Sequence, residues 1–185
     1  MGKFEVEKCP IEGLYIIKPT SFSDIWNYDI ETYNEKVMEE NGLKMVFVQD
    51  NQSMSLKGVL RGLHVQVKYP QVKLVRAIKG SVFDVAVDLR NGSNTFGKWY
   101  GIELSEKNKK QFYISEGFAH GFLTLTESAE LCYKVSEFWH PNDELGIPWD
   151  DPDINIDWPI KKGQIPFLAE KDKNYAKLAT HRELW

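Results

Sequence analysis

Cysteine, histidine and long apolar runs are all scarce in this chain of 185 residues. The two cysteines, Cys9 and Cys132, lie far apart and form no closely spaced pair of the kind that binds zinc. The N-terminus shows no secretory signal pattern, so we expect reduced thiols in a cytoplasmic protein. No apolar run approaches the roughly 20 residues of a membrane-spanning helix, so we expect no membrane segment.

A positive charge excess is also missing. The chain has 23 Lys and Arg against 27 Asp and Glu, a formal net charge of −4. General nucleic-acid binding needs a basic field, so we expect no nucleic-acid partner. A few local Arg and Lys side chains can still hold an anionic small molecule. The length suits one domain with a sizeable core, so we expect a single domain over residues 1–185.

The middle of the chain shows one strand pattern after another. Segments rich in β-branched and aromatic residues are separated by turn signals such as "RNGSN" and "SEKN". Many short, evenly spaced strands predict an all-β sandwich or barrel. The expected strands are residues 43–50, 57–67, 73–80, 81–90, 99–104, 110–115, 120–126 and 129–139.

Helix signals are few. Residues 34–43 are the best candidate, with Asn34 as a possible N-cap, Glu35 in the first turn and Gly42 as the stop. The tail, residues 168–185, can carry a turn or two. The Pro- and Asp-rich residues 148–159 should form an ordered loop.

The segment "SVFDVAVDL" has two different faces. Its odd-numbered positions, 83 to 89, are all apolar, whereas the even-numbered face includes Asp84 and Asp88. One interpretation is that the apolar face packs outward on a second sheet while the acidic face looks into a polar interior. The other is that the acidic face is solvated, which is common for a half-buried strand.

Only four histidines are present, which bears on metal binding. Barrels with this strand pattern often bind a metal through a His-x-His pair, but here His64 is followed by Val65 and Gln66. His120 has no partner close in sequence. Two isolated histidines make a poor ligand set, so we expect no metal.

The stretch "GVLRGLHVQ" is unusually polar for the centre of a strand. His64 has a structural interpretation, a core histidine hydrogen-bonded to a neighbour. Arg61 should project from the opposite face unless Gly62 introduces a bulge. Polar groups at a strand centre need partners, which favours a pocket. Taken singly, Lys73 is best explained as an exposed strand-end lysine, and Tyr133 as a core tyrosine with its hydroxyl at the edge.

Several long motifs, taken together, carry a resemblance. "GVLRGLHVQ", "QVKLVRAIKGSVFDVAVDLRNGSNTFGKW", "GFAHGFLTL", "YKVSEFW" and "GIPWDDPDINIDWP" occur in an order that resembles the dTDP-4-dehydrorhamnose 3,5-epimerase family, over residues 12–175. The resemblance implies an all-β, cupin-like jelly-roll barrel with short peripheral helices. It also implies a homodimer, no metal or other cofactor, and a nucleotide-linked 4-keto-6-deoxy sugar as substrate.

The resemblance also implies roles in proton transfer. A ketone at C4 acidifies the C–H bonds at C3 and C5, and inversion needs a base on one face of the sugar and an acid on the other. By resemblance, His64 is the base, Tyr133 is the acid, and Asp172 pairs with His64. Imidazole alone is too weak to deprotonate a carbon acid, so fixed donors must stabilise the enolate oxygen. By resemblance these are Lys73 and His120, and we expect Asp84 to orient His120.

The remaining implied contacts hold the nucleotide end of the substrate. Arg61 suits the diphosphate because guanidinium groups pair with phosphate oxygens in a fork. The other positions implied to bind substrate are Gln49, Asn51, Glu31, Glu144 and an aromatic residue that stacks on the pyrimidine, Phe138 or Trp139.

One segment departs from the family pattern Asp-x-Arg-Gly-x-Phe-x-Glu. Here it reads "DIWNYDIE", in which Asp24 and Glu31 match the pattern. Trp26 replaces the arginine, Asn27 the glycine and Asp29 the phenylalanine. The resemblance implies that this segment reaches the partner subunit's pocket. A lost charged hydrogen bond would weaken binding by about 1.5–3 kcal/mol, or the change marks a different nucleotide or sugar.

The leading expectation is an isomerase that inverts C3 and C5 of dTDP-4-dehydro-6-deoxy-D-glucose to give dTDP-4-dehydro-L-rhamnose. One alternative is a 3-epimerase, or an epimerase on another nucleotide 4-keto sugar. Another is a non-catalytic cupin that binds a sugar nucleotide, and a metal-dependent cupin oxygenase is the most distant.

Overall fold

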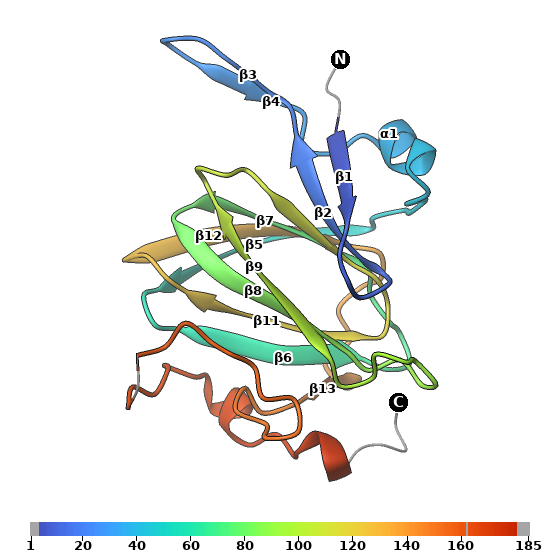
Figure 1. Cartoon of the computed structure of the whole chain (residues 1–185), viewed down its shortest axis with the longest axis vertical. Helices are drawn as coiled ribbons and strands as arrows, with labels where there is room; N and C mark the ends of the chain where they lie inside the picture. Colours follow the sequence, from blue (N-terminus) through green and yellow to red (C-terminus); the bar gives the residue numbers. More distant parts are fainter. Residues whose placement is uncertain (1–3, 162, 181–185) are drawn as a thin grey trace.

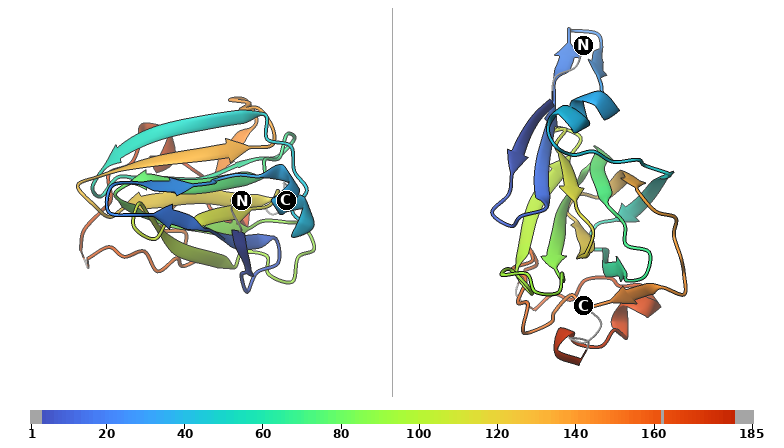
Figure 2. Two further views of the ribbon diagram at one scale, coloured as in Figure 1. Left: turned by 90° about the horizontal axis from the view of Figure 1, so that it is seen from above. Right: turned by 90° about the vertical axis from the view of Figure 1, so that its right-hand side faces the viewer.

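Two antiparallel β-sheets face each other in this protein (Figures 1 and 2). The computed structural model describes residues 4–161 and 163–180. The six-stranded sheet has the order β1 (Phe4–Lys8), β2 (Leu14–Pro19), β10 (Gln111–Ile114), β7 (Lys73–Lys79), β12 (Ser128–Val135), β5 (Gln49–Leu56). The five-stranded sheet has the order β13 (Glu144–Gly146), β6 (Leu60–Gln66), β11 (Phe118–Thr124), β8 (Ser81–Asp88), β9 (Trp99–Ser105).

From β5 to β13 the chain changes sheet at every connection except the one between β8 and β9. Strands that are neighbours in sequence therefore face each other across the interior rather than pair. This connectivity suits a jelly roll and confirms the all-β prediction.

The strand predicted over residues 43–50 is wrong. Residues 41–48 form no strand, and β5 begins at Gln49. The segment has the alternation of apolar and polar residues that is typical of a strand. The apolar ones, Leu43, Met45 and Phe47, instead pack as an irregular segment against the outer face of the six-stranded sheet. β5 itself, "QDNQSMSL", was missed because an edge strand beside a polar cavity has few apolar residues. β1, β2 and β13 were also missed.

The expected helix is confirmed as α1 (Glu35–Glu40), which covers the outer face of the six-stranded sheet through Met38. The Asn34 side chain accepts a hydrogen bond from the backbone N–H of Val37 at 3.2 Å, and Gly42 ends the helix at φ +77°. None of the described helices is long and apolar enough to cross a membrane.

Ahead of α1, the short strands β3 (Ser21–Ser23) and β4 (Tyr28–Ile30) form a hairpin that projects away from the two sheets (Figure 1). The tail carries two short 3-10 turns, η1 (Glu170–Lys173) and η2 (Leu178–Thr180), as expected. Residues 181–185 of the predicted tail lie outside the described residues.

β8 has the two faces that its sequence predicted, but the apolar one packs differently. Asp84 and Asp88 are fully buried, so the interpretation of a solvated acidic face is wrong. On the other face, Val85 and Val87 pack with Trp158 and other side chains of the C-terminal segment. The expectation of a second sheet on this face is therefore wrong, since an irregular segment covers it (Figure 1).

The C-terminal segment is anchored on both sides of residues 168–177. On one side, the backbone N–H of Phe167 donates to Gly58 O at 2.9 Å and Leu60 N–H donates to Phe167 O at 3.0 Å. On the other, Leu178 N–H donates to Oδ2 of the buried Asp151 at 2.8 Å. Asp151 Oδ1 also accepts from Asp153 N–H, which orders the predicted loop. Residues 168–177 are thereby held against the five-stranded sheet.

β6 has an irregular register at its polar centre, as Gly62 in the sequence suggested. The register between β11 and β6 shifts between His120 and Phe122, and Gly62 has φ +119°. A Cβ on Gly62 would lie 2.5 Å from Gly121 Cα, so the two backbones approach closely. The shift lets Arg61 and His64 line one cavity, although strict alternation would separate them.

We predict that Gly62→Ala lowers the free energy of unfolding by about 3 kcal/mol or more, since it combines a disfavoured φ with a backbone clash. Gly92→Ala is the matched control. Gly92 has φ +74°, but a Cβ there would meet no atom within 4 Å, so we expect a cost of about 1 kcal/mol. Urea denaturation of both variants measures the difference, and equal costs would contradict the close approach.

Candidate active site

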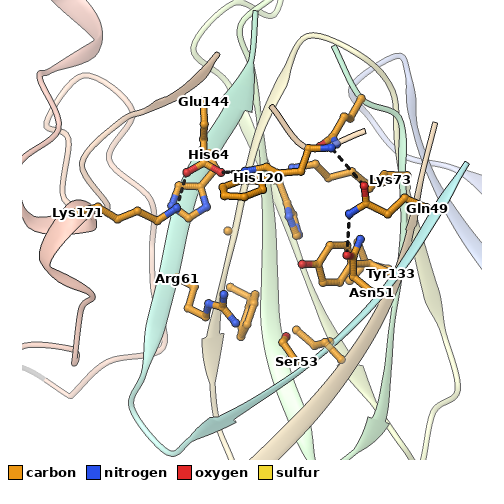
Figure 3. A pocket seen from close by; sticks show the side chains of 17 residues that line it. Gln49, Asn51, Ser53, Arg61, His64, Lys73, His120, Tyr133, Glu144 and Lys171 are labelled. Carbon is orange, nitrogen blue, oxygen red and sulfur yellow. Dashed lines mark hydrogen bonds and ion pairs between the residues drawn. The ribbon is translucent and has the colours of Figure 1, made fainter. Parts of the chain in front are cut away.

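A cavity of about 330 Å³ lies between the two sheets (Figure 3). Residues of both sheets line it. The six-stranded sheet provides Gln49, Asn51, Ser53, Lys73, Val75, Leu131, Tyr133 and Val135. The five-stranded sheet provides Arg61, His64, His120, Gly121, Phe122 and Glu144. Gln71, Trp139 and Lys171 complete the lining from outside the sheets.

His64 is held by a carboxylate from the C-terminal segment. Its Nε2 lies 2.7 Å from Oδ1 of Asp172, which is 2% exposed. Burial tends to raise the pKa of Asp172, but the hydrogen bond to His64 and the histidine's charge outweigh it, and the pKa is lowered. The carboxylate is therefore ionised, so His64 carries its proton on Nε2 and leaves Nδ1 as an acceptor.

A second imidazole and carboxylate pair lies beside the first. His120 Nε2 is 2.8 Å from Oδ1 of Asp84, which is fully buried. His120 is the register partner of His64 across β11 and β6, so the two histidines are neighbours in the five-stranded sheet. Both expected pairings are present in the structure.

Lys73 enters the cavity from the opposite sheet (Figure 3). Burial lowers the pKa of Lys73 to about 8, while the charges of Glu144 and Asp84 oppose the shift. A lysine of this kind is still largely charged at neutral pH. It places one positive charge across the cavity from the two histidines.

Tyr133 lies on β12, and Gln49 and Asn51 lie beside it on β5. The Gln49 amide donates to Asn51 Oδ1 at 2.8 Å and accepts from the backbone N–H of Trp139 at 3.2 Å. These bonds fix the amide groups at the cavity wall. On the other wall, Arg61 forms no ion pair with any described residue, so its guanidinium remains available.

Lys171 is the cationic lining residue that the sequence analysis missed. It lies on η1, next to Asp172, and pairs with Oε1 of Glu144, whose Oε2 accepts from Trp139 Nε1 at 3.1 Å. Burial tends to raise the pKa of Glu144, but the bond from Lys171 and the nearby His64 lower it. Adjacency to Asp172 was the one sequence signal for Lys171. Ser53 was missed too, and its buried hydroxyl has no partner among the described residues.

Two predicted binding residues lie away from the cavity. Phe138 does not line it, whereas Trp139 does, so Trp139 is the one of the two predicted aromatic residues that lies at the cavity. Glu31 is also outside the lining, and its Oε1 accepts from Asn34 Nδ2 at 3.0 Å. The departing segment that includes Trp26 belongs to the projecting hairpin (Figure 1).

Metal ligands do not cluster in the described part of the chain. Over residues 4–161 and 163–180, no three His, Cys, Asp or Glu side chains gather in a group that could hold a metal ion.

A family model described as dTDP-4-dehydrorhamnose 3,5-epimerase matches residues 8–180. The chain belongs to this family. The dTDP-4-dehydrorhamnose 3,5-epimerase of Methanothermobacter thermautotrophicus is 51% identical over 178 residues, which cover 96% of each protein. The dTDP-4-dehydrorhamnose 3-epimerase of Streptomyces niveus is 38% identical over 175 residues, 94% of this chain and 83% of that protein.

Solved structures of epimerases share the fold of this chain. The 3,5-epimerase from Legionella pneumophila, solved in complex with dTDP-4-keto-L-rhamnose, has a TM-score of 0.88 and 46% sequence identity. The match covers 92% of this chain and 90% of that chain. The expected cupin-like jelly roll is therefore confirmed.

We predict that neutral His64 in the free epimerase carries its proton on Nε2, because ionised Asp172 accepts from that atom. Nitrogen-15 NMR of labelled protein distinguishes the tautomers. In Asp172→Asn the preference should weaken, whereas Asp153→Asn, on the exposed loop, should leave it unchanged. A wild-type His64 protonated on Nδ1 would contradict the assignment.

Proposed function

We propose that this epimerase inverts C3 and C5 of dTDP-4-dehydro-6-deoxy-D-glucose, giving dTDP-4-dehydro-L-rhamnose, with no cofactor. One observation carries the proposal: His64, backed by a buried carboxylate, and Tyr133 face one cavity from opposite sheets. A base and an acid on opposite walls suit inversion of a carbon centre between them. Family membership supports the same reaction.

In the proposed reaction His64 Nδ1 takes the proton from C3 or C5 of the substrate. The C–H electron pair forms a double bond to C4, and the C4 carbonyl becomes an enolate. Tyr133 then donates its hydroxyl proton to the same carbon from the opposite face, and the C4 ketone reforms. His64 is left protonated and Tyr133 ionised, so exchange with solvent resets both groups.

The enolate needs positive charge at the C4 oxygen as it forms. Lys73 and His120 approach the cavity from opposite sheets and suit this role. Asp84 holds His120 through Nε2 and so orients its ring. The partly buried ammonium of Lys73 acts in a medium of reduced dielectric, where charge stabilisation is stronger than in water.

The nucleotide end of the substrate would occupy the outer part of the cavity. Arg61 forms no ion pair with a described residue, so its guanidinium suits a diphosphate. Lys171, which is paired with Glu144, provides a second cation. The Trp139 ring suits stacking on the pyrimidine. Gln49 and Asn51 offer amide groups, and Phe138 and Glu31 remain assigned by resemblance alone.

We also infer a homodimer in which the β3–β4 hairpin of each subunit reaches the partner's cavity. The hairpin projects from the sheets and exposes Phe22 (55%), Ile25 (87%), Trp26 (86%) and Tyr28 (58%). This much apolar surface on one protrusion suits burial in a partner. Glu31, which follows the hairpin, would then act near the partner's site.

The enzyme is proposed to work as one domain in the cytoplasm. Cys9 and Cys132 are both free thiols, the state that reducing compartments maintain. The cavity draws residues from both sheets and from η1, so its groups come together only when these parts fold together.

We predict that the wild-type enzyme, incubated with dTDP-4-dehydro-6-deoxy-D-glucose in deuterated water, incorporates deuterium at both C3 and C5. Proton NMR follows the loss of each signal. His64→Asn should slow both exchanges by about 1,000-fold, within the range of losing a general base. His140→Asn, a histidine outside the cavity, is the matched control and should exchange at the wild-type rate.

Three outcomes of that experiment would change the proposal. Label at C3 alone would make the protein a 3-epimerase. Exchange in His64→Asn at the wild-type rate would remove His64 as the base. If folded wild-type protein exchanges no proton at C3 or C5, dTDP-4-dehydro-6-deoxy-D-glucose is not its substrate.

We predict an alkaline limb near pH 8 in the profile of kcat/KM, because Lys73 has its pKa lowered to about 8 and loses its charge as the pH rises. Lys73→Arg keeps a positive charge above that pH. The variant should be slower overall but lack the limb near pH 8. Steady-state rates from pH 6 to 10 measure this, and an unchanged limb in Lys73→Arg would assign it to another group.

A further inference from the structure

Tyr175 lies against the His64–Asp172 pair and is not among the residues that line the cavity. It follows η1 by two residues, within the anchored part of the C-terminal segment. Its ring centroid is 5.8 Å from that of His64, with an angle of 78° between the planes. Such an edge-to-face arrangement restricts the tilt of the imidazole.

The neighbouring strand leaves room for this ring. Gly146 on β13 is the register partner of His64 on β6. A Cβ on Gly146 would lie 2.3 Å from Cε2 and 2.4 Å from Cζ of Tyr175. The φ of Gly146 is not in the left-handed region, so its backbone suits other residues. The absence of a side chain at position 146 is therefore required by the Tyr175 ring.

The side chain of Tyr175 also lies close enough to Asp172 for the two groups to interact. Burial, followed by the negative charges of Asp172 and Glu144 and a hydrogen bond to Asp172, raises the pKa of Tyr175. The phenol therefore keeps its proton and acts as a donor. Asp172 has acceptor capacity left, because Oδ1 faces His64 and Oδ2 accepts a long bond of 3.3 Å from Gly62 N–H.

We propose that Tyr175 is a positioning residue for the epimerisation: its hydroxyl donates to Asp172, and its ring holds His64 and keeps water from the pair. The inference rests on the proposed function, in which His64 is the base. With the Tyr175 hydroxyl added to His64 and Gly62 N–H, three donors would share the charge of this carboxylate and fix its plane. The plane of the carboxylate in turn fixes the direction in which His64 Nδ1 points into the cavity.

Other charged groups also face this pair, and the test must separate them from Tyr175. Glu144 on β13 and Lys171 on η1 both act on the charge of the pair. His120 lies beside His64 on β11. Tyr175→Phe leaves all three in place and removes only the hydroxyl.

The experiment compares wild type with Tyr175→Phe in steady-state kinetics from pH 5 to 9, with dTDP binding measured by calorimetry. We expect kcat to fall by about three- to tenfold, the effect of one hydrogen bond. Binding of dTDP should not change, because Tyr175 does not line the cavity. The acidic limb of kcat/KM should move to higher pH, since Asp172 with one donor fewer attracts the imidazole proton more strongly.

Two further variants serve as controls. Tyr100→Phe removes a partly buried tyrosine hydroxyl that contacts Cys9, away from the cavity, and should leave kcat and the acidic limb unchanged. Gly146→Ala should displace the Tyr175 ring and reproduce the fall in kcat.

Some outcomes would overturn the inference. If Tyr175→Phe loses thermal stability but keeps the wild-type kcat and acidic limb, Tyr175 is structural only. A weakened dTDP affinity with unchanged kcat would make it a binding residue instead. If the wild-type enzyme is active and Tyr175→Phe behaves like it, only this inference is overturned. If the wild-type enzyme is inactive on this substrate, the proposed function and this inference are overturned together.

Discussion

The bond between Asp172 and His64 links the fold of this protein to its chemistry. Asp172 is buried, and an ionised carboxylate removed from water destabilises a protein by several kcal/mol unless partners compensate. Its partners, His64 and Gly62 N–H, both lie on β6, 108 and 110 residues earlier in the chain. The C-terminal segment can therefore dock favourably only where these partners are in place. The same docking fixes the tautomer of His64, so one interaction holds the C-terminal segment on the sheet and orients the proposed base.

The space between the two sheets is divided into an apolar core and a polar cavity. Away from the cavity, Phe112, Ile114 and Ala86 belong to an apolar cluster between the sheets. The polar cavity opens elsewhere between the same strands, and its charged groups are compensated in pairs: His120 with Asp84, and Lys171 with Glu144. A second apolar cluster lies outside the five-stranded sheet, under the C-terminal segment. Because this outer cluster contributes stability, the interior can hold a partly buried ammonium such as that of Lys73, at the energetic cost that its lowered pKa reflects.

Sequence patterns predicted the parts of the molecule that local physics determines. The central strands, the cap at Asn34 and the two faces of β8 follow from periodicity and capping chemistry. The pairing of Asp172 with His64 came only from family resemblance, because no local pattern links positions 108 residues apart. β5 was missed since its side chains serve a polar cavity rather than a core. Lys171 and Tyr175 were missed because two backbone anchors, rather than any periodicity, position the segment that carries them.

The hairpin shows how a departure from the family pattern can be compensated within the same site. A guanidinium at position 26 would neutralise phosphate, whereas the indole of Trp26 can only stack or bury apolar surface. The cavity already presents Arg61 and Lys171, so cationic groups for the proposed diphosphate do not depend on the hairpin. At the hairpin tip, Asp24 accepts backbone bonds from Trp26 and Asn27, which keeps the turn formed without the family glycine. The turn is thus formed, and in the proposed homodimer it would offer the partner's cavity an apolar contact in place of an ionic one. In the proposed homodimer such a contact would be less sensitive to salt than an ionic one, so nucleotide selection there would depend on the fit of the base rather than on charge.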